Sequence, residues 1–117
     1  MRLLHTPMCS KARTALGLLD EAGYTPEIVP YREEGVLTPA LLQEIEEKTG
    51  TPLKDLLRKG EEAYAQAQAL EGDALRAFVC ENPELLERPI LIVGDRAVVG
   101  RPPERVWELV SASGPNA

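Results

Sequence analysis

Cys9 stands where a short apolar run meets the start of a predicted helix. Unpaired backbone N–H groups and the positive end of the helix dipole lie at such a position. Both favour the thiolate over the thiol, and the thiolate is the nucleophilic form of cysteine. The same N–H groups can bind an oxyanion. We therefore expect a nucleophile and an anion site within one short segment.

Basic side chains close to Cys9 in the sequence could add positive charge there, namely His5, Lys11 and Arg13. Two of them, His5 and Arg13, have an alternative interpretation. His5 could be structural, and Arg13 could be an ordinary charge on a helix surface. Cys9 itself could be a buried structural cysteine, which is common.

The composition excludes several classes of protein. The chain has 117 residues, which suits one domain, and its net charge of -6 opposes general binding to nucleic acid or anionic membranes. We find no apolar stretch of the ~20 residues that a membrane helix needs, and no signal peptide. The two cysteines lie far apart, and neither they nor the one histidine have metal-ligand spacing. We expect a cytoplasmic protein with reduced thiols and no bound metal or cofactor.

Periodicity and turn residues predict an order of strand–helix–strand, then helices, then two strands and a helix. The expected strands are residues 2–5, 27–31, 89–93 and 97–100. The expected helices are 10–22, 39–48, 53–57, 61–70, 73–82 and 103–110, with 111–117 frayed. This order favours an α/β thioredoxin-like fold, with a four-stranded mixed sheet. We expect a single domain over 1–117, with a core of 1–35 and 86–112 and a helical insertion over about 36–85.

Four motifs together resemble a known family. They are His5-x-Pro7-x-Cys9-Ser10-Lys11-x-Arg13, Leu56-Leu57-Arg58-Lys59, Arg88-Pro89-Ile90 and Gly100-Arg101-Pro102. In this order they resemble the glutaredoxin-dependent arsenate reductases, the ArsC family, which includes the related Spx and YffB proteins. The resemblance covers nearly the whole chain and implies the thioredoxin-like fold with a helical insertion.

The resemblance also implies roles for particular residues. Cys9 would attack arsenate, and His5 would tune its thiolate. Glutathione would then attack the Cys9 adduct as co-substrate, and glutaredoxin would resolve the mixed disulfide. Pro89 would follow a cis peptide bond. The oxyanion would be bound by Arg58, Arg88 and Arg101, with Ser10, Lys11 and Arg13 beside the nucleophile.

The chemistry of arginine supports this assignment. Its planar fork can bind two oxygens of a tetrahedral anion at once, which a lysine ammonium cannot do. The chain departs from the family where Thr6 and Ala12 replace residues that are often Asn and a small polar residue. Because position 12 is Ala, there is no CxxC pair, and Cys80 is the only internal candidate for a resolving thiol.

Alternatives therefore stay open. Cys80 could simply pack within a helix. The whole protein could instead be a Spx-like interaction protein, or a YffB-like thiol reductase with another substrate.

Overall fold

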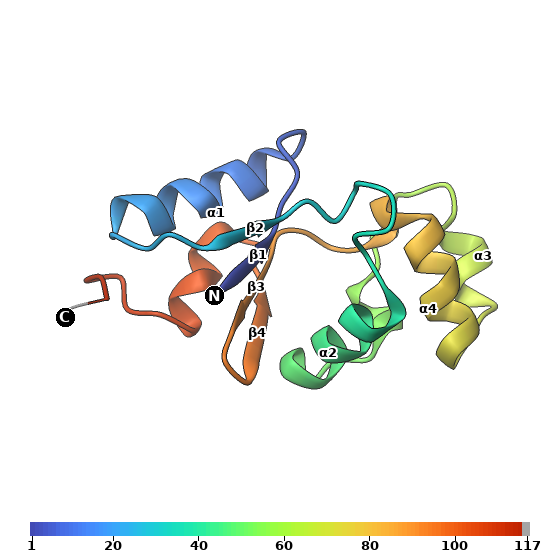
Figure 1. Cartoon of the computed structure of the whole chain (residues 1–117). Helices are drawn as coiled ribbons and strands as arrows, with labels where there is room; N and C mark the ends of the chain where they lie inside the picture. The colour runs from blue at the N-terminus through green and yellow to red at the C-terminus, as the bar shows by residue number, and fades with distance from the viewer. Residues whose placement is uncertain (116–117) are drawn as a thin grey trace. The chain divides into compact units, whose positions relative to one another are not determined.

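The computed structural model describes residues 1–115, and contacts divide the chain into two compact units. The first unit comprises Met1–Pro30 and the chain from Arg88 onward, and the second comprises Tyr31–Glu87 (Figure 1). We predicted these boundaries after residue 35 and before residue 86. Our expectation of a frayed end at 116–117 lies outside the described residues.

The first unit contains the predicted four-stranded mixed sheet. Its strands are β1 (Arg2–Leu4), β2 (Glu27–Val29), β3 (Ile90–Val93) and β4 (Arg96–Val99), in the spatial order β2-β1-β3-β4. β1 runs parallel to β2 and antiparallel to β3, while β3 and β4 form a hairpin. The fold class predicted from the sequence is therefore confirmed.

One face of this sheet is covered by helix α1 (Ser10–Glu21) and by η3 (Pro103–Glu108). Ala15 and Leu19 from α1 pack into a buried cluster with Leu3 of β1. The same cluster includes Leu91 of β3 and Val106 of η3. This packing fixes the start of α1, and with it Cys9, at the end of the sheet where β1 finishes.

The last predicted helix differs from our expectation. It ends at Glu108 rather than at residue 110, and it is a 3₁₀ helix. Its turns carry bonds to the third residue back, from Arg105 N–H to the Pro102 carbonyl at 3.0 Å and from Leu109 N–H to the Val106 carbonyl at 3.1 Å. Short helices of one or two turns commonly take this tighter form.

The second unit is helical. It contains α2 (Pro39–Thr49), η1 (Leu53–Leu56), α3 (Tyr64–Gln68), α4 (Gly72–Glu81) and η2 (Pro83–Leu85). The Thr38 hydroxyl accepts a hydrogen bond from the Leu41 N–H at 3.1 Å, which caps α2 as its Thr-Pro start predicts.

The expected helix over 61–70 shrinks to the five residues of α3. Within α3, only Ala67 is buried, so little apolar packing supports a longer helix there.

No helix in the part of the chain that the structure describes is long and apolar enough to cross a membrane.

Candidate active site

The Cys9 loop is held in place by backbone hydrogen bonds. Cys9 is the N-cap residue of α1, and its N–H donates to the Thr6 carbonyl at 3.2 Å. Its own carbonyl accepts from the Arg13 N–H at 3.1 Å, which starts the helix. Thr6 is almost fully buried and Cys9 is only 8% exposed, so the loop is anchored to the unit rather than free in solvent.

Opposing effects act on the pKa of the Cys9 thiol. Burial is the largest and raises it, whereas the backbone N–H of Ala12, the Arg88 guanidinium and the N–H of Lys11 lower it. The lowering effects together outweigh burial, so the pKa of the Cys9 thiol lies below its ordinary value. The sulfur makes no capping hydrogen bond of strict geometry to α1. We therefore attribute the effect of the two amides to the proximity of their dipoles.

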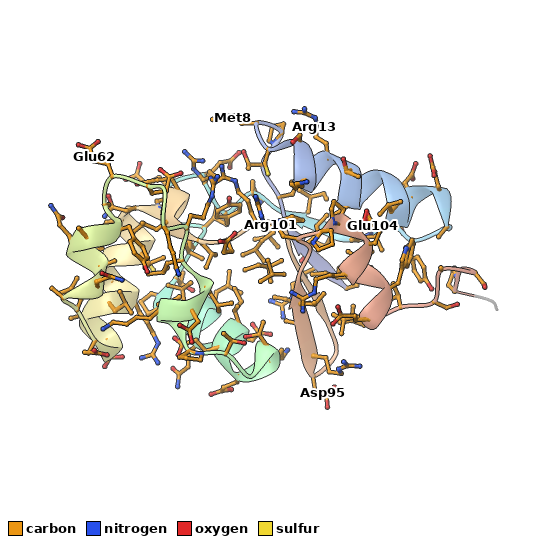
Figure 2. All side chains as sticks on the ribbon, turned by 180° about the vertical axis from the view of Figure 1, so that it is seen from behind. Met8, Arg13, Glu62, Asp95, Arg101 and Glu104 are labelled. Atoms are coloured by element: carbon orange, nitrogen blue, oxygen red, sulfur yellow. The ribbon has the colours of Figure 1, made fainter. Side chains whose placement is uncertain are left out.

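Arg88 and Arg101 lie beside each other in the same unit as Cys9. Arg88 acts on the thiol both through a hydrogen bond and through its positive charge. Arg101, which is labelled in Figure 2, donates from Nη1 to the Arg88 carbonyl oxygen at 3.3 Å. The structure thus places Arg88 next to Cys9 and Arg101 next to Arg88, although Cys9 is far from both in the sequence.

The β3–β4 hairpin joins these two arginines. The Gly100 N–H donates to the Pro89 carbonyl at 2.8 Å, next to the register pair of Ile90 and Val99. A Cβ atom on Gly100 would lie only 2.9 Å from Cγ of Pro89, so this close approach requires glycine. The Arg88–Pro89 peptide bond is cis, and so is the Arg101–Pro102 bond, about which we made no prediction.

His5 lies at the end of β1, where its N–H donates to the Val29 carbonyl at 3.1 Å. Burial, followed by the positive charge of Arg13, lowers the pKa of its imidazole below the ordinary value of 6.5. This lowering of the pKa disfavours the charged imidazole and so works against the positive charge that we considered for His5. Its Nε2 atom is buried and has no hydrogen-bond partner among the described residues.

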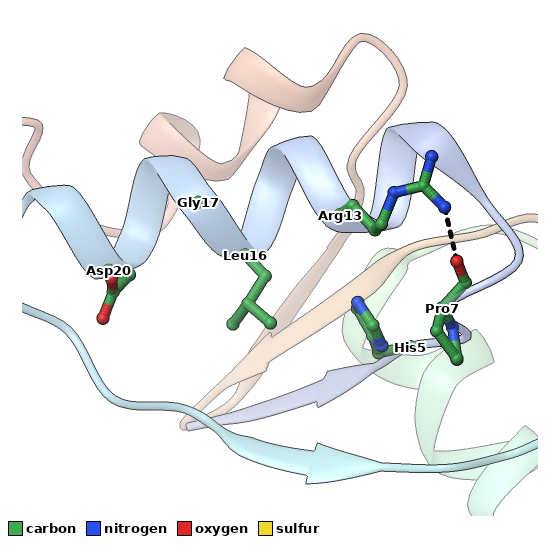
Figure 3. A pocket seen from close by; sticks show the side chains of 6 residues that line it. All are labelled: His5, Pro7, Arg13, Leu16, Gly17 and Asp20. Carbon is green, nitrogen blue, oxygen red and sulfur yellow. Dashed lines mark hydrogen bonds between the residues drawn. The ribbon is translucent and has the colours of Figure 1, made fainter.

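The remaining predicted residues of the helix start differ in what they contact. Arg13 donates from Nη1 to the Pro7 carbonyl, which ties α1 to the Cys9 loop (Figure 3). Ser10 is exposed, and its carbonyl accepts from the Thr14 hydroxyl at 2.9 Å. Lys11 is exposed, and its backbone N–H acts on the Cys9 thiol. That these three residues bind an anion stays a prediction.

Arg58 belongs to the second unit, so its position relative to Cys9 also stays a prediction. Its N–H donates to the Leu85 carbonyl at 2.7 Å, beside an antiparallel bridge between Leu57 and Leu86. Its guanidinium pairs with the Glu61 carboxylate at 3.2 Å.

The pKa shift of Cys80 is opposite in direction to that of Cys9. Cys80 is half-buried in α4, and burial together with the negative charge of Glu81 raises its pKa. A raised pKa disfavours the thiolate that a resolving cysteine needs. Residues 1–115 contain no group of three or more His, Cys, Asp or Glu side chains that could hold a metal ion.

A surface pocket that we did not predict lies beside α1. Its volume is about 440 Å³, and Figure 3 shows the residues that line it, which are His5, Pro7, Arg13, Leu16, Gly17 and Asp20. Four of them lie on one face of α1, at positions i, i+3, i+4 and i+7. This helical spacing is a sequence signal that could have revealed the shared face.

Comparisons with known proteins show which family the chain belongs to. The model of the ArsC family matches residues 4–109. The chain is 35% identical over 114 residues to an arsenate reductase of Neisseria meningitidis, covering 91% of this chain and 94% of that protein. It is equally identical, at 35%, to the uncharacterized protein YfgD of Escherichia coli, with coverage of 94% and 96%. The solved arsenate reductase of Vibrio cholerae superposes with a TM-score of 0.83 at 33% identity, covering 94% and 98% of the two chains. The chain therefore belongs to the ArsC family.

Proposed function

We propose that this protein is an oxidoreductase that reduces arsenate to arsenite, with Cys9 as the nucleophile. The observation that carries the proposal is the pairing of Cys9 with Arg88, whose guanidinium favours the thiolate. Arg101 lies next to Arg88, within hydrogen-bond reach of its carbonyl. A nucleophilic sulfur beside two arginines suits a reaction with a tetrahedral oxyanion, and arsenate reductases are among the relatives.

In the first step, the Cys9 thiolate attacks the arsenic of arsenate. A sulfur–arsenic bond forms, and one arsenic–oxygen bond breaks as the protonated oxygen leaves as water. The arginines bind the remaining oxygens and offset the repulsion between the anion and the thiolate. Their positive charge also stabilises the negative charge that develops as the oxygen leaves. We propose that Arg58 joins Arg88 and Arg101 in this role, with Ser10, Lys11 and Arg13 near the helix start.

In the second step, the thiolate of glutathione attacks the sulfur of the Cys9 adduct. A disulfide forms, and the electron pair of the sulfur–arsenic bond passes to arsenic, which leaves as arsenite. Two thiols are thus oxidised to one disulfide while As(V) is reduced to As(III). Glutaredoxin then attacks the glutathione sulfur and releases the Cys9 thiolate. The reduced thiols that this cycle needs suit the cytoplasm.

The test is arsenate-dependent oxidation of NADPH, with glutathione, glutaredoxin and glutathione reductase supplied. The wild type should consume NADPH only when arsenate is present, and Cys9→Ser should consume none. NADPH consumption that needs glutathione and a disulfide substrate but no arsenate would instead identify a YffB-like thiol reductase. The absence of any turnover by the wild type would leave the Spx-like interaction protein as the better reading.

A further inference from the structure

Arg58 carries an ion pair within its own segment of the chain. Its Nη1 atom donates to Oε1 of Glu61 at 3.2 Å, and both residues belong to the second unit. The two side chains are 27% and 30% exposed, so the pair is partly shielded from solvent. An arginine that we expect to bind an oxyanion therefore already binds a carboxylate of the same chain.

A tight turn brings the two partners together. The Glu61 N–H donates to the Arg58 carbonyl at 3.3 Å, with Lys59 and Gly60 between the two residues. Such a bond, from the fourth residue of a turn back to the first, is typical of a β-turn. Because both partners belong to one turn, the contact between their side chains follows from the local backbone.

Backbone hydrogen bonds fix both ends of this turn. At the first end, the Arg58 N–H donates to the Leu85 carbonyl at 2.7 Å. At the second end, the Glu61 carbonyl accepts from the N–H of Tyr64, the first residue of α3, at 3.1 Å. The backbone thus holds the two residues side by side, while their partly exposed side chains can still exchange partners.

A carboxylate at this place opposes a second anion in two ways. The bond to Glu61 uses Nη1 of Arg58, which an anion bound through both terminal nitrogens of the guanidinium would need. An anion bound along the edge that includes Nε could leave this bond intact, but it would lie near a like charge. In both cases the carboxylate stabilises the empty site relative to the occupied one, and the affinity for the anion falls.

We propose that Glu61 competes with the substrate anion for Arg58 and so limits the affinity of the site for that anion. The inference rests on the proposed function, in which Arg58 binds arsenate together with Arg88 and Arg101. When arsenate binds, the guanidinium exchanges a carboxylate oxygen for an oxygen of the substrate, and the Glu61 side chain turns to solvent. The exchange makes and breaks no covalent bond.

The kinetic experiment compares Glu61→Gln with Glu62→Gln in the glutathione-coupled assay of arsenate reduction. Both variants remove one negative charge from neighbouring positions. Glu61 carries the ion pair to Arg58, whereas Glu62 is exposed and serves as the matched control (Figure 2). Glu61→Gln should lower the KM for arsenate about two- to five-fold, the range of an exposed ion pair, and Glu62→Gln should change it less.

A double-mutant cycle tests whether this gain depends on Arg58. In an Arg58→Gln background, Glu61→Gln should leave the KM for arsenate unchanged, because the group for which it competes is gone. An equal gain in both backgrounds would indicate general repulsion of the anion and would overturn the inference. So would a KM that Glu61→Gln leaves unchanged or raises in the presence of Arg58, since a raised value would mean that Glu61 orients the arginine for the substrate.

A binding measurement separates this inference from the proposed function. Inorganic sulfate, a tetrahedral dianion that the thiol does not reduce, should slow the alkylation of Cys9 by iodoacetamide in a Cys80→Ser background at constant ionic strength. Half protection should need less sulfate in Glu61→Gln than in the wild type. That difference in a protein that reduces no arsenate would support the competition and overturn the proposed reaction. Arsenate reduction with equal sulfate protection in both proteins would support the reaction and overturn the competition.

Discussion

Arg88 offers the sharpest test of how the fold activates Cys9. Replacing it by glutamine removes the positive charge and keeps a polar, though shorter, side chain. The N–H groups of Lys11 and Ala12 remain, so part of the stabilisation of the thiolate survives, while burial continues to oppose it. A hydrogen bond to a charged group is worth about 1.5–3 kcal/mol. We take the lower end, because sulfur is a weak acceptor.

About 1.4 kcal/mol corresponds to a ten-fold change in the fraction of thiolate. The rate at which iodoacetamide alkylates Cys9 should therefore fall about ten-fold in Arg88→Gln, at any pH below the pKa of the thiol. The inflection of the rate against pH should move upward. The measurement belongs in a Cys80→Ser background, so that Cys9 is the only reacting thiol.

Arg96→Gln is the matched control, since it removes the same charge from the same unit at an exposed position on β4. Its pH profile should overlay that of the wild type. If Arg88→Gln overlays the wild type as well, the guanidinium does not act on the thiolate and the physical basis of the proposed site is wrong.

Three further predictions concern other residues. Cys9→Ser should abolish arsenate reduction without changing the circular dichroism spectrum, because the serine alkoxide is inaccessible at neutral pH. Cys80→Ser should keep more than half of the activity, and a complete loss of activity in this variant would make Cys80 the resolving thiol. Gly100→Ala should lower the free energy of unfolding by about 1–3 kcal/mol in urea titrations, because its methyl group would overlap the Pro89 ring, and an unchanged midpoint would contradict this. Because the folded pKa of His5 is lowered, the stability tied to its neutral form is present above pH 6.5 and is lost as the pH falls through the folded pKa. His5→Gln should therefore weaken the fall in stability between pH 7.5 and acidic pH, and identical slopes in both proteins would exclude this role.

The sheet and its hairpin could be predicted because their signals are local. The Gly94-Asp95 pair separates two apolar runs, and the structure turns there between Val93 and Arg96. The helix that starts after Cys9 follows in the same way from its apolar spacing. Such signals are missing over 61–70, where the predicted helix was too long. They are also missing after Pro103, where the helix is shorter than predicted and is a 3₁₀ helix.

Side-chain partners were harder to predict, since they depend on how distant segments meet. The motifs predicted that Arg88 and Arg101 act together, but nothing local indicates that one donates to the carbonyl of the other. Arg13 is predicted to bind the anion, and nothing in the neighbouring sequence indicates that it also donates to the Pro7 carbonyl. The lowered pKa of His5 likewise comes from burial and from Arg13, neither of which its own position in the sequence reveals.

In the β3–β4 hairpin, Arg88 precedes the first strand and Arg101 follows the second. The two arginines therefore lie at the same open end of the hairpin. The strand pairing from Ile90–Val99 to Val93–Arg96 sets the spacing between these arginines. The exposed Gly94-Asp95 turn closes the opposite end of the hairpin. Residues inserted into the turn would lengthen the hairpin at the end away from the arginines. A one-residue slip in the strand pairing would instead shift Arg88 relative to Arg101. The turn can thus change in length while the paired end of the hairpin holds Arg88 and Arg101 in fixed register, as the proposed binding of one small anion requires.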